Sequence, residues 1–188
     1  MATYLGDPTA KYQGRLSLNP LAHLDPMGTL MLFIAGFGWG RPVPFNMSHL
    51  RNPRVDAALI ACAGPLANLL LAFLFAVPYR YLYFSDIEPS VAPRLLTNLF
   101  QFMGVMINLN LVLMIFNLLP IPPLDGSKIF SLILPGDALY RLYRYRNLGY
   151  GILILLVFSG SLFGVNILST YILQPIVGFF WDLVLFSS

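Results

Sequence analysis

The chain has 188 residues, of which 57% are hydrophobic and only 10% are charged, and its formal net charge is +3. Soluble domains carry about 25% charged residues, so this composition excludes an ordinary soluble protein and predicts an integral membrane protein. The weak positive charge argues against a nucleic-acid-binding protein, which needs a strongly basic face. The single cysteine, Cys62, excludes an intrachain disulfide and a cysteine-based zinc site.

The first 56 residues are the most polar part of the chain, with repeated Pro, Gly and Asn turn signals. Within them, residues 28–40 are apolar, but 13 residues are too few for the roughly 20 that a spanning helix needs. We therefore expect a short re-entrant or interfacial segment there.

Three later segments are long and apolar enough to cross a membrane. Residues 57–82 contain one charge, Arg80, whereas residues 95–124 and 147–181 contain none. Prolines 120, 122 and 123 must end the second helix, because proline lacks the N–H group that a helix needs. Gly164 interrupts the third segment, which can be one long helix or two elements meeting there.

These segments predict a mostly α, polytopic membrane protein with three to four transmembrane helices. We divide this single membrane-embedded domain into a polar or re-entrant region (1–56), core helices (57–126), a basic loop (127–147) and a C-terminal hydrophobic region (148–188).

Charge differs between the connecting loops. Residues 41–56 and 125–147 are basic, whereas residues 79–94 carry two charges of each sign. By the positive-inside rule, the two basic loops face the cytoplasm of a multi-pass cell-membrane protein and the third faces outward. Within the second basic loop, arginines alternate with Tyr140, Tyr143 and Tyr145. This alternation suits a segment at the level of the lipid headgroups; an ordinary solvated basic loop is the alternative.

The most informative stretch is residues 117–126, where the three prolines leave backbone carbonyls without helical partners just before Asp125. A carboxylate at membrane depth costs about 2.5 kcal/mol or more unless it is paired, hydrated or bound to a cation. Asp125 is therefore a candidate functional residue, although it can also be simply the first polar residue of the loop.

The same run, Asn-Leu-Leu-Pro-Ile-Pro-Pro-Leu-Asp-Gly, resembles the N-x-x-P-x-P-x-L-D-G signature of the site-2 proteases, which are intramembrane zinc metalloproteases. Further stretches resemble the bacterial branch of that family, in order along the chain: residues 6–11, 14–20, 23–29, 38–46, 51–54 and 63–65 with Asn68. The similarity extends from Gly6 to Gly126, and beyond it only a generic hydrophobic tail follows.

The resemblance implies a mechanism. In the family, zinc is held by two histidines of an H-E-x-x-H helix and by the aspartate of the L-D-G motif, which is Asp125 here. The glutamate is the general base, and the substrates are transmembrane proteins cut within the lipid bilayer. Asn117 can donate a hydrogen bond to the substrate carbonyl or oxyanion, or alternatively to a neighbouring helix. Structural or supporting roles are expected for His23, Asp25 and Gly126.

The chain departs from the family in one respect. Its two histidines are His23 and His49 and its one glutamate is Glu88, so the 188 residues contain no H-E-x-x-H. The family pattern overlays Ala2 and residues 6–7 and places the second zinc histidine three residues before Met1. We therefore expect the reading frame to continue upstream through the missing helix.

Three other interpretations compete with this one. The chain can be a catalytically inactive homologue that binds transmembrane segments without cutting them. A substitute zinc site made of His23, Asp25 and His49 is disfavoured against structural roles for these residues, and Glu88 falls in the predicted outward loop, away from Asp125. An unrelated transporter or assembly subunit is disfavoured by the ordered motif matches. The sequence does not indicate an oligomeric state.

The predicted orientation can be tested with single cysteines placed in a Cys62→Ala background and treated with a membrane-impermeant thiol reagent. Cysteines in residues 41–56 and 128–146 should be protected in intact cells, and cysteines in residues 85–93 should react, because the basic loops face the cytoplasm. Labelling of the 41–56 loop from outside would reverse the topology.

Overall fold

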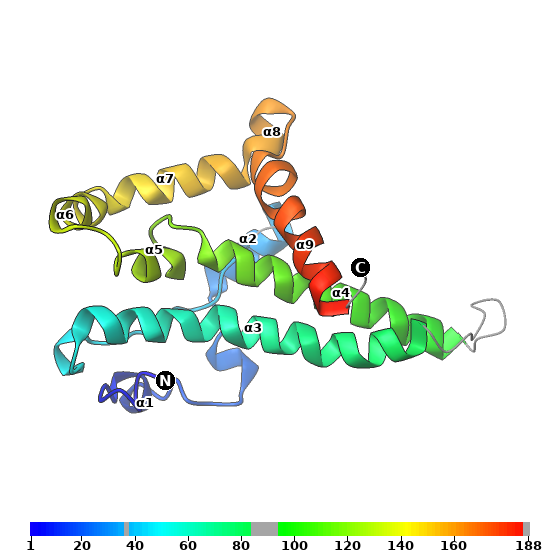
Figure 1. Cartoon of the computed structure of the whole chain (residues 1–188), viewed down its shortest axis with the longest axis horizontal. Coiled ribbons are helices and arrows are strands. Elements are labelled where there is room, and N and C mark those ends of the chain that lie inside the picture. The colour runs from blue at the N-terminus through cyan, green and yellow to red at the C-terminus, as the bar shows by residue number, and fades with distance from the viewer. Residues whose placement is uncertain (36–37, 84–93, 186–188) are drawn as a thin grey trace. The chain divides into compact units, whose positions relative to one another are not determined.

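Helices dominate the computed structural model, which describes residues 1–35, 38–83 and 94–185 (Figure 1). Within these ranges the extended pairing is limited to an isolated antiparallel bridge between Leu24 and Gly40. The predicted outward loop at 85–93, with Glu88, lies outside the described residues. Contacts divide the chain into two compact units, residues 1–60 and 61–188, and each is described by itself.

The first unit is built from short helical pieces around the fully buried carboxylate of Asp7. Its elements are α1 (Thr9–Tyr12), η1 (Pro20–Ala22), α2 (Pro26–Ala35), η2 (Met47–His49) and the first two turns of α3 (Pro53–Tyr83). The side chain of Asp7 is fully buried. It accepts hydrogen bonds from the backbone N–H and the hydroxyl of Thr9, and from the backbone N–H of Asn46 at 2.7 Å. Nδ1 of His49 lies 3.1 Å from Asp7 Oδ1. Asp7 thereby joins α1 to η2.

These contacts determine the ionisation of Asp7. Burial by itself would raise the pKa of the Asp7 carboxyl. The hydrogen bonds from Thr9, Asn46 and His49 favour the charged form more strongly, and together they hold this pKa well below its ordinary value of 3.8. The carboxylate is therefore ionised at neutral pH.

A second set of polar contacts holds the loop that follows α2. The Arg15 guanidinium donates to the carbonyl oxygens of Ala22 and Pro42, each at 2.6 Å. The helix α2 covers Pro26–Ala35, so it begins two residues before the apolar stretch 28–40 that is expected to be re-entrant or interfacial and includes the first part of that stretch. The position of this helix in a membrane stays a prediction.

Three helical stretches are long and apolar enough to cross a membrane: α3, α4 (Arg94–Leu118), and the π-helical η3 (Leu168–Leu173) continuing into α9 (Gln174–Leu185). The expected mostly α, polytopic fold is confirmed. The helix α3 begins at Pro53, four residues before the predicted start at 57. Asp56 Oδ2 accepts a hydrogen bond from the backbone N–H of Asn52 at 2.9 Å and so stabilises this earlier start.

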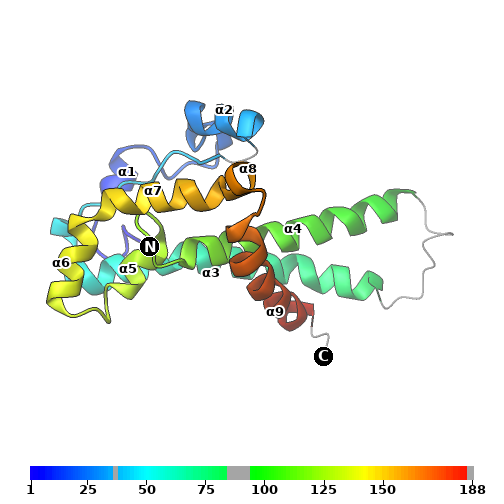
Figure 2. The ribbon, with the colours of Figure 1, turned by 90° about the horizontal axis from the view of Figure 1, so that it is seen from above.

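The second unit has its core where α3, α4, η3 and α9 meet, and α9 crosses α4 in both views (Figures 1 and 2). The buried side chains that meet there are small on α3 and large on α4: Ala72, Ala76, Ile107, Leu111, Met114, Ile115, Leu168, Leu173, Val177 and Val184. Alanines on α3 allow close helix approach. The ring of Tyr79 stacks on Phe100 at 4.2 Å and meets the edge of Trp181 at 6.0 Å.

The remaining elements of this unit are α5 (Asp125–Phe130), α6 (Gly136–Arg144), α7 (Arg146–Val157) and α8 (Ser159–Phe163). The C-terminal apolar region is thus interrupted at Gly164, with α7 and α8 before this glycine and η3 and α9 after it, and it is not the single long helix that was one of the two alternatives. Gly164 has φ +73°, a conformation that glycine adopts without strain. The buried Ser159 hydroxyl accepts a hydrogen bond from the backbone N–H of Ile167 at 2.9 Å and stabilises the reversal.

We predict that Asp7→Asn loosens the first unit, because an amide cannot accept hydrogen bonds at both of its polar atoms. Hydrogen exchange at the Asn46 amide should become faster, while exchange at Ile107 in the second unit stays unchanged. In the parent chain, the folded-state pKa of Asp7 is lowered, so its stabilisation is complete above about pH 4 and is lost as pH falls toward that lowered pKa. Equal Asn46 protection in both chains would contradict the role given to Asp7.

Candidate active site

The candidate site begins where the prolines stop α4. The helix ends at Leu118, and α5 starts at Asp125 after the Pro120–Pro123 turn, so the second span ends six residues before its predicted end at 124. The helix α5 packs closely against the end of α4: a Cβ at Gly126 would overlap the carbonyl oxygens of Leu118 and Leu119. A glycine at 126 therefore permits the approach that positions Asp125.

The helix α7 also approaches this turn closely. A Cβ at Gly149 would overlap the carbonyl oxygen of Pro122, so the backbone of α7 touches the turn directly. The Leu124 carbonyl accepts a hydrogen bond from the buried Ser127 hydroxyl at 2.7 Å. The irregular backbone around the prolines is thus packed against protein on two sides, as irregular backbone at membrane depth must be.

Asp125 has two different environments for its two carboxylate oxygens. Oδ1 accepts a hydrogen bond from the Lys128 ammonium at 3.0 Å, one helical turn along α5. Oδ2 faces α3, where a Cβ added at Gly64 would lie 3.5 Å away. The Asp125 side chain is 32% exposed, so the carboxylate keeps room for a further partner. A carboxylate of this kind can coordinate a cation.

Asn117 lies in the last turn of α4 and is partly exposed. Its Nδ2 donates to the Leu113 carbonyl at 2.9 Å, one turn back in the same helix. The structure thus shows a partner within α4 rather than the neighbouring helix considered from the sequence. A role of Asn117 toward a substrate stays a prediction.

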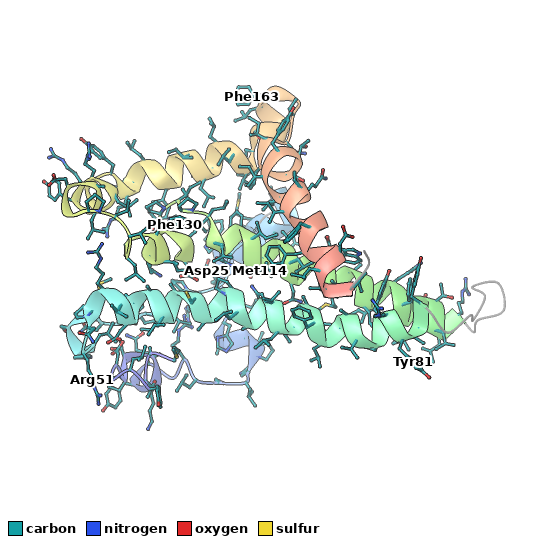
Figure 3. All side chains as sticks on the ribbon, viewed as in Figure 1. Asp25, Arg51, Tyr81, Met114, Phe130 and Phe163 are labelled. Atoms are coloured by element: carbon teal, nitrogen blue, oxygen red, sulfur yellow. The ribbon has the colours of Figure 1, made fainter. Side chains whose placement is uncertain are left out.

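The other candidate residues belong to the first unit and have separate partners there. His23 Nε2 lies 2.8 Å from the Ser17 carbonyl oxygen, and Asp25 Oδ1 accepts a hydrogen bond from the Gly28 N–H at 2.8 Å in the first turn of α2 (Asp25 is labelled in Figure 3). His49 is engaged with Asp7.

A catalytic zinc site takes three protein ligands and a water molecule. Among the described residues, no group of three or more His, Cys, Asp or Glu side chains is placed to hold a metal ion. The described residues therefore fit one carboxylate ligand of a zinc ion but do not form a complete site.

Sequence reasoning missed two neighbours of Asp125. Lys128 was counted only as a loop charge, although its spacing of three residues from Asp125 is the spacing of a helical ion pair. Gly64 belongs to the motif at residues 63–65, but nothing in the sequence predicts that it lies beside Asp125. The contact depends on how α3 and α5 pack.

Comparisons with known proteins agree with the motifs. Residues 85–159 match the profile of peptidase family M50. "Putative zinc metalloprotease YwhC" of Bacillus subtilis is 41% identical over 179 residues, covering 94% of this chain and 77% of the relative.

Two proteins named "Putative zinc metalloprotease Rip2" are also similar. The one from Mycolicibacterium smegmatis is 28% identical over 84% of this chain, and one from Mycobacterium tuberculosis is 35% identical over 64% of it. The chain spans 59% and 45% of their respective lengths. No solved structure matches the chain.

The close contact between Gly126 and the carbonyl oxygens at the end of α4 can be tested with Gly126→Ala. The added methyl group meets backbone atoms that cannot move independently, so we expect a loss of about 1–3 kcal/mol in the free energy of unfolding. Gly151→Ala in α7 is the matched control, because a Cβ there meets nothing within 4 Å and alanine favours a helix. Thermal unfolding in detergent measures the stability of both variants. Equal stability of Gly126→Ala and Gly151→Ala would show that Gly126 is not in close contact with the end of α4.

Proposed function

The chain belongs to peptidase family M50, the site-2 proteases, and on this premise we propose that it acts as an intramembrane zinc metalloendopeptidase. The substrates would be transmembrane proteins whose peptide bonds are hydrolysed within the bilayer. Three spanning-length helices support action inside a membrane. We place the protein in the cell membrane with loops 41–56 and 125–147 toward the cytoplasm.

The observation that carries the proposal is the setting of Asp125. This carboxylate follows a proline turn that α5 and α7 approach closely, and it remains one-third exposed with Oδ2 away from its lysine partner. We assign Asp125 as the carboxylate ligand of the zinc on which this family depends. Zinc supplies a Lewis acid and an activated water at neutral pH. Two further ligands and a general base are needed, and the family's H-E-x-x-H helix would supply them.

Asn117 would contribute by binding the substrate rather than the metal. Its amide lies in the last turn of α4, just before the turn that leads to Asp125, and it is partly exposed. An amide N–H group can donate to the carbonyl of the bond being cut or to the oxyanion that forms from it. To do so, the Nδ2 group would have to share or exchange its present bond to the Leu113 carbonyl.

A second candidate function applies if no H-E-x-x-H helix accompanies these 188 residues. A homologue without this motif would bind transmembrane segments without hydrolysing them. Both candidates use the same helices, and they differ in zinc content and in peptide-bond cleavage.

We expect the 188-residue chain to purify without stoichiometric zinc and to leave a model transmembrane substrate uncut, because one carboxylate is too few ligands. Joining an H-E-x-x-H helix before Met1 should restore zinc binding and cleavage. In that extended enzyme, Asp125→Ala should lower activity to background, since even partners of metal ligands are worth about 10-fold to 100-fold.

The control is Asp137→Ala, which removes an exposed carboxylate of α6 and should leave zinc content unchanged. Near-normal cleavage by the extended Asp125→Ala enzyme would show that Asp125 is not a ligand. An extended chain that binds its substrate but neither takes up zinc nor cuts the substrate would favour the second candidate. If the 188-residue chain bound one zinc ion per molecule, His23 and His49 would again be candidate zinc ligands.

A further inference from the structure

Positive charge is concentrated in α6 and at the start of α7. Residues 136–146 contain three arginines, Arg141, Arg144 and Arg146, against one aspartate, Asp137, which leaves a net charge of +2. All three arginines are exposed. Within the described part of the chain, no carboxylate lies within ion-pair distance of any of them. We call these arginines, with Tyr140 and Tyr145, the α6 surface.

The tyrosines of the α6 surface hold one guanidinium without neutralising it. The Arg144 guanidinium lies 5.9 Å from the ring centre of Tyr140 and 5.9 Å from that of Tyr145. One of its N–H groups points to the Tyr140 hydroxyl at 3.4 Å. An arginine has five N–H donors, so most of them remain available to an acceptor from outside the chain. Phosphate oxygens match this donor geometry well.

Exposed apolar side chains lie in the chain just before α6. Phe130 at the end of α5 (labelled in Figure 3), Leu132 and Ile133 are 43%, 41% and 77% exposed. On the other side of α6, α7 begins at Arg146 and exposes Leu148 and further apolar side chains. Exposed basic, aromatic and apolar side chains thus follow one another along residues 130–148. This combination is typical of segments that lie at a membrane surface.

We propose that the α6 surface binds the headgroups of anionic phospholipids, with the residues at 130–133 entering the adjacent acyl region. The positive charge of the arginines complements the headgroup phosphates, and the tyrosine rings suit the interfacial layer. An acidic protein would complement the arginines but would not account for the exposed Phe130 and Ile133 beside them. The inference does not depend on proteolytic activity or on zinc.

The test uses the whole chain with Cys62→Ala and Ile133→Cys, labelled with an environment-sensitive fluorophore and placed in lipid nanodiscs. Ile133 is the most exposed apolar residue of the 130–133 turn, so it can carry a label without disturbing the packing. Emission is compared between phosphatidylcholine alone and an equal mixture with phosphatidylglycerol. We expect blue-shifted, brighter emission in the anionic mixture.

Two variants show whether the arginines cause this response. In Arg141→Gln with Arg144→Gln, the ratio of docked to undocked label in the anionic mixture should fall roughly thirtyfold, from about fivefold for each cation near an anionic surface. Arg141→Lys with Arg144→Lys should keep the response, because headgroup attraction requires charge rather than ring contacts. The control, Arg41→Gln with Arg51→Gln, removes the same charge from exposed positions in the first unit and should also keep it.

Three results would overturn the proposal. Equal emission of the label in both lipid compositions would exclude binding to anionic headgroups. If Arg141→Gln with Arg144→Gln then changed this emission, the arginines would contact protein instead of lipid. Loss of the response in the lysine pair would show that the arginines act through their ring contacts. An equal loss in the Arg41 and Arg51 control would show that only net charge matters.

Discussion

Three prolines between residues 120 and 123 impose the constraint on which the rest of the second unit depends. Each proline lacks a backbone N–H and cannot continue a helix, so α4 has to end at Leu118, and the chain turns before α5 begins at Asp125. In a membrane-embedded chain, the carbonyl groups freed by that turn need protein around them. The glycines at 126 and 149 let α5 and α7 approach the turn closely enough to provide it.

The consequence is a carboxylate held in a defined place without being fully paired. One carboxylate oxygen of Asp125 accepts a hydrogen bond from the Lys128 ammonium, while the other faces Gly64 of α3. An exposed ion pair with a spacing of three residues contributes only about 0.3–0.5 kcal/mol, so the pair orients the carboxylate more than it stabilises the fold. Such weak pairing leaves the carboxylate able to exchange its lysine partner for another cation.

The first unit follows a different principle, because its organising residue is buried rather than open. Asp7 has no solvent contact, and the hydrogen bonds from Thr9 and Asn46, with the close contact of His49, compensate the cost of burying its charge. The first unit has little apolar core, with Ala10, Leu50, Ala57 and Ala58 as its buried hydrophobic side chains among the described residues. Hydrogen bonds to Asp7 and from Arg15 therefore stabilise the first unit, whereas apolar packing stabilises the helices around α4.

The sequence by itself determined the features that depend on neighbouring residues. Long charge-free runs indicated the spanning helices, prolines marked the end of α4, and the motif from Asn117 to Gly126 identified the family and Asp125. It left the region after residue 147 undecided, because Gly164 can kink a helix or end it. Only the tertiary structure brought Gly64 to Asp125 and buried Asp7 beside His49. These pairs are distant in sequence, so their contact depends on how helices and loops pack, which no local pattern of residues encodes.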